Sequence, residues 1–126
     1  MKIVGAALVM SAALLAQSPS WQIPPNAAEE KSPLAQDAST VKKGAALYKS
    51  NCQNCHGATG LGDGPDADLK TARRKPANLT ISRTSDGVMF YKIWNGRNKP
   101  KMPAFKTDLS RDDVWRVIHY VKTFRQ

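Results

Sequence analysis

The feature that most constrains this chain is the stretch NCQNCHG at residues 51–57. It holds the only two cysteines, Cys52 and Cys55, and places His56 directly after the second one. Two thiols at this spacing, followed by an imidazole, serve in only a few chemistries. The compartment that the chain reaches and the residues around the motif decide among them.

The first 20 residues have the layout of a secretory signal. Lys2 is followed by the uncharged run IVGAALVMSAALL at 3–15, and then by small and polar residues. This run is shorter than the roughly 20 apolar residues of a membrane-spanning helix. We therefore expect cleavage after Ala16 or Ser20 and export to the periplasm, with an uncleaved anchor as the alternative.

Residues 21–39 carry Pro24, Pro25 and Pro33 and few large apolar side chains. This composition predicts a flexible, extended tether rather than packed structure. The folded domain is then expected at residues 40–126, a length with limited capacity to bury apolar surface by itself.

In an exported domain of this size, the cysteine motif favours covalent haem attachment. A thiol redox pair would follow an apolar strand, and none precedes the motif. A structural zinc site needs four ligands, and only Cys52, Cys55, His56 and the distant His119 are available. C-x-x-C-H is the pattern of haem c: each thiol forms a thioether, and the histidine can reach the iron. One motif predicts one haem, which also supplies the core that a short domain lacks.

Three segments, at 40–50, 85–96 and 110–126, carry apolar residues at helical spacing. The last is the clearest, because Ser110 and Asp113 form a capping box at its start. The middle segment should stop at Gly96, and its inward-facing candidates are Val88, Met89 or Tyr91, and Trp94. Strand signals are absent, and the glycine-rich loop after the motif has a turn-forming pattern. The expected fold class is all-α.

Haem iron takes a second axial ligand or keeps an open site, and this choice separates electron carriers from catalysts. Met102 lies between two prolines in the loop RNKPKMPAFK. Apolar packing would not explain an exposed thioether there, and the prolines restrict the local backbone. Met89 falls within a helix, where packing is the usual role of methionine. His119 suits a solvated or partly packed side chain. We therefore expect His56 and Met102 as the metal ligands.

With these features, residues 41–124 resemble the small class I cytochromes c of bacteria, which bind a single haem. The likeness rests on four features in family order: Gly44 with Tyr48, CQNCH, KMPAF, and a last helix with Val117 and Tyr120. It implies three or more helices around one covalent haem. It also implies that the first and last helices cross at these glycine and aromatic positions.

The resemblance assigns roles to KPANLT at residues 75–80. By likeness, the Pro76 carbonyl would orient His56, and Leu79 would pack on the haem. Trp94 is a further candidate for contact with the cofactor. The chain departs from the family in a long glycine-rich insertion before Pro76, and in one extra residue between Pro76 and Leu79. The insertion resembles those in cytochrome subunits of bacterial respiratory enzymes.

The charge is strongly positive, with 19 Lys and Arg against 10 Asp and Glu. Between residues 70 and 106, ten basic residues accompany a single acidic one, and Lys99, Lys101 and Lys106 flank Met102. We expect a basic patch around the haem edge that steers an acidic redox partner. An ordinary solvated surface is the alternative, and anionic lipid is a weaker target. Nucleic acid is disfavoured by export and by the lack of an aromatic platform.

The sequence thus predicts a periplasmic carrier of single electrons, not an enzyme, with no small-molecule substrate. The first alternative is the same domain as a bound subunit of a membrane respiratory complex. The second is a haem enzyme or gas sensor with a loosely held Met102, although no second histidine or acid is placed to assist such chemistry.

Overall fold

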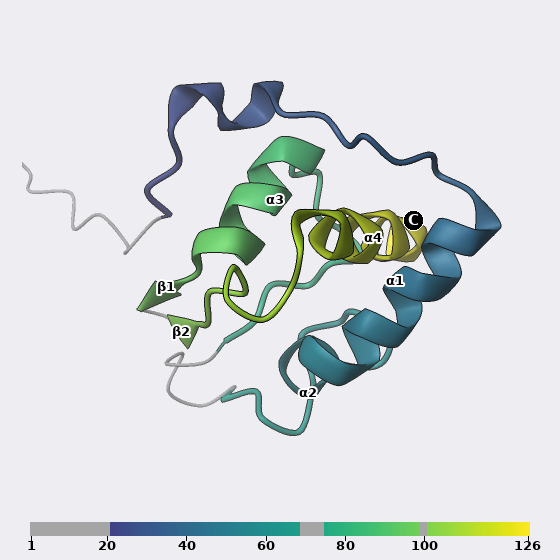
Figure 1. Cartoon of the computed structure of the whole chain (residues 1–126). Helices are drawn as coiled ribbons and strands as arrows, with labels where there is room; N and C mark the ends of the chain where they lie inside the picture. The colour runs from purple at the N-terminus through teal and green to yellow at the C-terminus, as the bar shows by residue number, and fades with distance from the viewer. Residues whose placement is uncertain (1–20, 69–74, 99–100) are drawn as a thin grey trace, which may run out of the picture.

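The computed structural model describes residues 21–68, 75–98 and 101–126. Its elements in chain order (Figure 1) are η1 (Pro25–Glu29), α1 (Ala38–Asn51), α2 (Gln53–His56), α3 (Asp86–Asn95), β1 (Arg97–Asn98), β2 (Lys101–Met102), α4 (Arg111–Val121) and η2 (Lys122–Phe124). The expected all-α fold class is confirmed. The proposed signal at 1–20 and Lys99 lie outside the described residues. Within those residues, no helix has the length and apolar character of a membrane span.

Helices α1 and α4 cross in direct contact, as Figure 1 shows. A Cβ atom on Gly44 would overlap the carbonyl oxygen of Arg116, so only glycine permits this approach. One turn further along α1, Tyr48 is 1% exposed, and its ring meets Tyr120 edge-on with 5.4 Å between centroids. The predicted close approach at Gly44 and the aromatic contact with Tyr120 are therefore confirmed.

Helix α4 starts at the predicted capping box. The Ser110 hydroxyl accepts a hydrogen bond from the Asp113 backbone N–H at 3.1 Å, and the Asp113 carboxylate accepts one from the Ser110 N–H at 3.4 Å. This geometry satisfies N–H groups that the first turn of a helix leaves without partners. The helix then buries Val114, Trp115, Val117, Ile118 and Val121.

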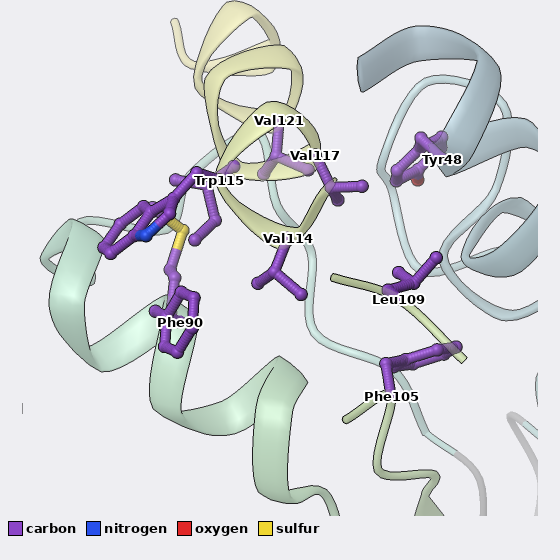
Figure 2. Packing of buried hydrophobic residues seen from close by; sticks show 10 residues of the cluster. Tyr48, Phe90, Phe105, Leu109, Val114, Trp115, Val117 and Val121 are labelled. Carbon is purple, nitrogen blue, oxygen red and sulfur yellow. The ribbon is translucent and has the colours of Figure 1, made fainter. Parts of the chain in front are cut away.

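The core lies where α4 meets α1 and α3. Figure 2 shows Val114 and Val117 of α4 between Phe90 and Trp115 on one side and Tyr48 on the other. The Phe90 and Trp115 rings stack with 4.6 Å between centroids. One stripe of side chains on α4 thus packs against both α1 and α3.

Helix α3 follows Ser85 and ends before Gly96, in agreement with the sequence analysis. Gly96 has φ of 61°, a conformation that favours glycine. It leads into β1, which pairs with β2 in an antiparallel register that places Arg97 opposite Met102. No strand was expected here, because strands of two residues are too short to show an alternating pattern.

The segment at 25–37 differs from the expected tether, because it packs on α3 and α4. Pro25 occupies the first turn of η1, where its missing N–H is tolerated. Ala27 is buried, and its carbonyl lies so close to Gly87 that a Cβ atom there would overlap it. Glu30 then forms an ion pair with Arg111. Prolines and small residues therefore build a close contact here instead of an extended linker.

The sequence allowed a solvated or a partly packed side chain for His119, and the structure buries it, with 4% of its surface exposed. Its Nε2 lies 2.8 Å from the Ser32 hydroxyl, and its Nδ1 contacts the Gln36 side-chain oxygen. The Gln36 amide also donates to the His119 backbone carbonyl at 2.9 Å. The packed N-terminal segment provides these partners, and a reading of α4 alone could not reveal them.

Candidate haem site

A cavity lies against the inner faces of α1, α2, α3, α4 and the β1–β2 hairpin. Its wall is predominantly apolar, with cations from a few positions. Its lining residues include Cys52, Cys55, His56 and Met102, together with Trp21, Tyr48, Lys75, Pro76, Ala77, Leu79, Met89, Lys92, Ile93, Arg97, Lys101, Phe105, Val117 and Ile118.

The junction of α1 and α2 brings the motif to this cavity. The Cys52 N–H donates to the Tyr48 carbonyl at 2.8 Å, and the His56 N–H donates to the Cys52 carbonyl at 2.9 Å. Cys52, Cys55 and His56 thus lie on one short helical turn, and all three line the cavity. The Tyr48 hydroxyl donates to the Gly57 carbonyl at 2.7 Å and ties the end of this turn to α1.

The environment of the thiols does not suit a redox pair. Burial raises the pKa of Cys52 to about 12, and the neighbouring Cys55 adds to the effect. The thiolate is the reactive form in disulfide exchange, and redox cysteines have a lowered pKa. The structure therefore disfavours thiol redox chemistry at this motif.

The His56 ring is held in an orientation that suits a metal ligand. Its Nδ1 lies 3.2 Å from the Ala77 carbonyl. Burial lowers the pKa of His56, and this hydrogen bond opposes the shift. A neutral ring that donates from Nδ1 leaves the Nε2 lone pair for a metal.

The orienting carbonyl is that of Ala77, so the prediction of Pro76 was wrong by one residue. The chain has one more residue between Pro76 and Leu79 than the family pattern, so the pattern did not determine which carbonyl contacts His56. Both Pro76 and Leu79 still line the cavity. The role of Leu79 as a contact of the ring stays a prediction.

The glycine-rich loop closes on the motif from outside. The Gly62 N–H donates to the His56 carbonyl at 2.8 Å, and the Gly64 N–H donates to the Cys55 carbonyl at 3.1 Å. Gly62 has φ of 80°, and a Cβ atom on it would crowd the Pro76 carbonyl. These contacts give the loop the turn-forming role that the sequence predicted.

Met102 reaches the same cavity from the hairpin. It is half-buried on β2, next to the loop that leads to the buried Phe105. The Phe105 N–H donates to the Ile93 carbonyl at 3.0 Å, which ties this loop to α3. Met89 is buried in the core, as expected for a packing methionine, and also touches the cavity.

Trp94 does not line the cavity, which corrects its place among the candidate cofactor contacts. It stacks on Phe90 with 5.6 Å between centroids, and the Arg111 guanidinium lies over the same pair of rings. The preceding residue, Ile93, lines the cavity instead. A helix rotates about 100° per residue, so a shift of one position changes the face that a side chain occupies.

The sequence analysis missed several other residues of the wall. They include Trp21, which lies in the segment expected to be a tether, and also Lys92, Ile93, Arg97 and Phe105. Gly87 could have signalled the packing of the N-terminal segment, since glycine near the start of a helix often marks a close approach.

The donor set fits haem c. Two thiols on one helical turn, an imidazole beside them and a thioether from another wall surround an apolar cavity. The family model described as cytochrome c oxidase, cbb3-type, subunit III matches residues 39–121. The chain belongs to this family of c-type cytochromes.

Individual relatives agree with this assignment. Cytochrome c6 of Synechococcus sp. (strain ATCC 27167 / PCC 6312) is 30% identical over 84 residues, which are 67% of this chain and 70% of that protein. A chain of the Kuenenia stuttgartiensis reducing HAO-like protein complex matches with a TM-score of 0.65 and 31% identity. That match covers 75% of this cytochrome but 47% of the other chain, so this cytochrome spans about half of its length.

Two further solved structures share the fold. The c-type cytochrome named KustC0563 has a TM-score of 0.55 and 25% identity, and the match covers 66% of this chain and 98% of that one. Cytochrome cL of Methylophaga aminisulfidivorans MPT has a TM-score of 0.56 at 19% identity, over 69% of this chain and 54% of that one. The cytochrome therefore carries one haem c, attached through Cys52 and Cys55, and belongs to a class of electron carriers.

Proposed function

We propose that this cytochrome is a periplasmic carrier of single electrons between redox proteins, with its iron held by His56 and Met102. One observation carries the proposal: the imidazole and the thioether come from different walls and line the same apolar cavity. Bound haem c supplies the one-electron couple. If His56 and Met102 both held the iron, they would leave it no open site for a substrate.

The surrounding residues give each proposed ligand a defined place. The Ala77 carbonyl fixes the His56 ring, and the glycine-rich loop closes behind it. Met102 is anchored by the β1–β2 pairing on one side and by the Phe105 hydrogen bond on the other. A His/Met pair raises the reduction potential relative to two histidines. These features support reversible electron transfer and not catalysis.

The ligand assignment is tested with Met102→Ala and a matched control, Met89→Leu. Oxidised wild-type protein should show the weak near-infrared band of sulfur bonded to ferric iron. Met102→Ala should lose the band and have a lower reduction potential, because the thioether favours ferrous iron. Met89→Leu removes the other methionine thioether of the described cavity wall and should keep both properties.

A band that survives in Met102→Ala would refute the assignment.

Reaction with carbon monoxide distinguishes the carrier from the haem enzyme or gas sensor. Ferrous wild-type protein should not bind carbon monoxide at neutral pH, whereas Met102→Ala should. Rapid binding by the wild-type protein would favour the sensor or enzyme.

We further propose that an acidic redox protein docks on the basic surface near Met102. Lys101 and Lys106 are exposed there, and Lys75 is exposed on the loop that carries Ala77. Attraction between opposite charges raises association rates and weakens with salt. Lys101→Gln should slow electron transfer to an acidic partner at low ionic strength, whereas Lys42→Gln on α1 should change the rate little.

A subunit bound to a membrane respiratory complex is the second candidate. The family description names an oxidase subunit, and one structural relative was solved as part of a complex. Copurification with a membrane complex after detergent extraction would favour this role. The mass of the mature protein would show in the same preparation whether residues 1–20 are removed, as export with cleavage requires.

A further inference from the structure

Two of the four lysine and arginine residues that line the described cavity wall lie against one aromatic ring. Lys92 comes from α3 and Arg97 from β1, and both lie against the indole ring of Trp21. The Lys92 Nζ atom is 5.4 Å from the ring centroid, and the Arg97 guanidinium carbon is 4.4 Å from it. Three segments of the chain therefore bring two positive charges and one aromatic face to a single place in the wall.

This arrangement is costly for the protein chain alone. Burial lowers the pKa of both Lys92 and Arg97, and the charge of Arg97 lowers that of Lys92 further. None of the ion pairs among residues 21–68, 75–98 and 101–126 gives Lys92 a carboxylate. Contact with an aromatic face compensates for this cost only in part. Adjacent like charges beside an apolar cavity nevertheless favour an anionic partner.

The haem provides such an anion. Its ring is apolar over most of its surface but carries two propionate carboxylates on one edge. Cys52 and Cys55 bind a different edge, because the vinyl groups that they attack lie away from the propionates. The carboxylates must therefore emerge elsewhere in the cavity wall, where cations can pair with them.

We propose that Lys92 and Arg97, held against Trp21, form the binding site for the two haem carboxylates. Arg97 can present two N–H groups to one carboxylate, and Lys92 can reach the other as a compact ammonium group. Trp21 is then a positioning residue, since its ring holds both cations at the wall. The proposal rests on haem attachment and deepens the proposed function.

Zero-length cross-linking of the intact holoprotein tests the site. A water-soluble carbodiimide activates a carboxylate, and a contacting lysine amine displaces the activated group to form an amide, while the carbodiimide leaves as its urea. After proteolysis, mass spectrometry should find the haem peptide that contains Cys52 and Cys55 joined to the peptide that contains Lys92. Lys75 and Lys101 also line the cavity and serve as internal comparisons.

Variants show which side chain is responsible for each cross-link. Lys92→Arg keeps the positive charge but should lose the link, since a guanidinium does not form the amide. Arg97→Lys should gain a second link, because it places an amine at the other carboxylate. Trp21→Ala should reduce the yield of the Lys92 link several-fold. Lys106→Arg is the matched control on the exposed loop and should leave the link unchanged.

A wild-type haem peptide without a link to Lys92 overturns the proposal, whether its carboxylates join Lys75 or Lys101, react with added glycinamide or stay unmodified. The near-infrared band is recorded on the same sample. An intact band without the link refutes the carboxylate site alone. A missing band with the link present refutes the axial role of Met102 and leaves the carboxylate site standing.

Discussion

The α1–α4 crossing and the opposite wall of the haem cavity are built in different ways. At the crossing, the backbone at Gly44 touches the Arg116 carbonyl, and aromatic rings from both helices interlock. The opposite wall, residues 75–84 and the β1–β2 hairpin, is mostly loop. It is held by isolated hydrogen bonds, such as those from Leu79 to Gly60 at 2.6 Å and from Phe105 to Ile93 at 3.0 Å.

The difference shows how the proposed bonds to the cofactor are distributed between the two regions. The cysteines and His56 follow directly from α1, so the covalent bonds lie on the rigid side. Met102 lies on the other side, whose apolar residues line the cavity and also pack against the core. The crossing is packed by direct contact between two helices of the protein. We therefore expect substitutions at the crossing to affect the whole fold.

The largest effect is expected for Gly44→Val. The new side chain would overlap the Arg116 carbonyl, and the helices would have to separate to accommodate it. Overpacking of this kind costs about 3 kcal/mol or more of unfolding free energy when backbone must move. Denaturant unfolding of the oxidised holoprotein measures the loss, with haem absorbance and far-UV circular dichroism as separate probes.

Ala46→Val is the matched control, because Ala46 is exposed on the same helix. It should cost about 0.5 kcal/mol, the usual helix penalty of a branched side chain. If Gly44→Val were no worse than this control, the crossing would not be the rigid region, and the contrast between the two sides would fail.

An intermediate effect is expected for Tyr48→Phe, which removes a link between α1 and the glycine-rich loop. The Tyr48 hydroxyl is buried and donates to the Gly57 carbonyl at the start of the glycine-rich loop. Its loss leaves that carbonyl without this donor and should cost about 1–2 kcal/mol. Tyr91→Phe at a half-buried position on α3 is the control and should change stability less. Equal losses in the two variants would show that the hydroxyl does not couple the loop to α1.

Much of the rigid side could be predicted from local sequence. The capping box at Ser110, the stop at Gly96 and the tight helix contact at Gly44 each follow from one residue type with one physical role. The cysteine motif is equally local, since a single turn of helix contains all of its parts. These features need no knowledge of distant segments, so the sequence was sufficient.

The other wall could not be predicted as well, because its contacts depend on segments far apart in the chain. The carbonyl that orients His56 belongs to Ala77 and not to Pro76, a difference of one residue. A one-residue difference in helix phase separates Ile93, which faces the cavity, from Trp94, which does not. Trp21 lies in a proline-rich stretch whose composition indicates a linker, and only its contacts with α3 and β1 reveal its place.

The smallest effect is expected at His119, where the N-terminal segment meets the rigid side. Burial lowers the pKa of His119, and nearby Lys122 lowers it further, while Asp86 and Asp37 oppose the shift less strongly. The unfolded chain therefore binds a proton more readily than the folded chain as the pH falls below about 6.5. The free energy of unfolding should therefore decrease as the pH falls from about 7 to 5.

His119→Gln should remove this part of the pH dependence, so the difference between the wild-type and variant unfolding midpoints isolates it from other groups. The pKa of Asp37 and that of Asp113 are lowered from the ordinary aspartate range, so these carboxylates affect stability only at a lower pH, below about 4.

Hydrogen exchange at a single backbone amide completes the test. The Leu34 N–H donates to the Ser32 hydroxyl, which contacts His119, so its hydrogen exchange should accelerate on acidification in the wild-type protein. Unchanged exchange at Leu34, together with parallel midpoints, would mean that protonation of His119 does not loosen the N-terminal segment from α4.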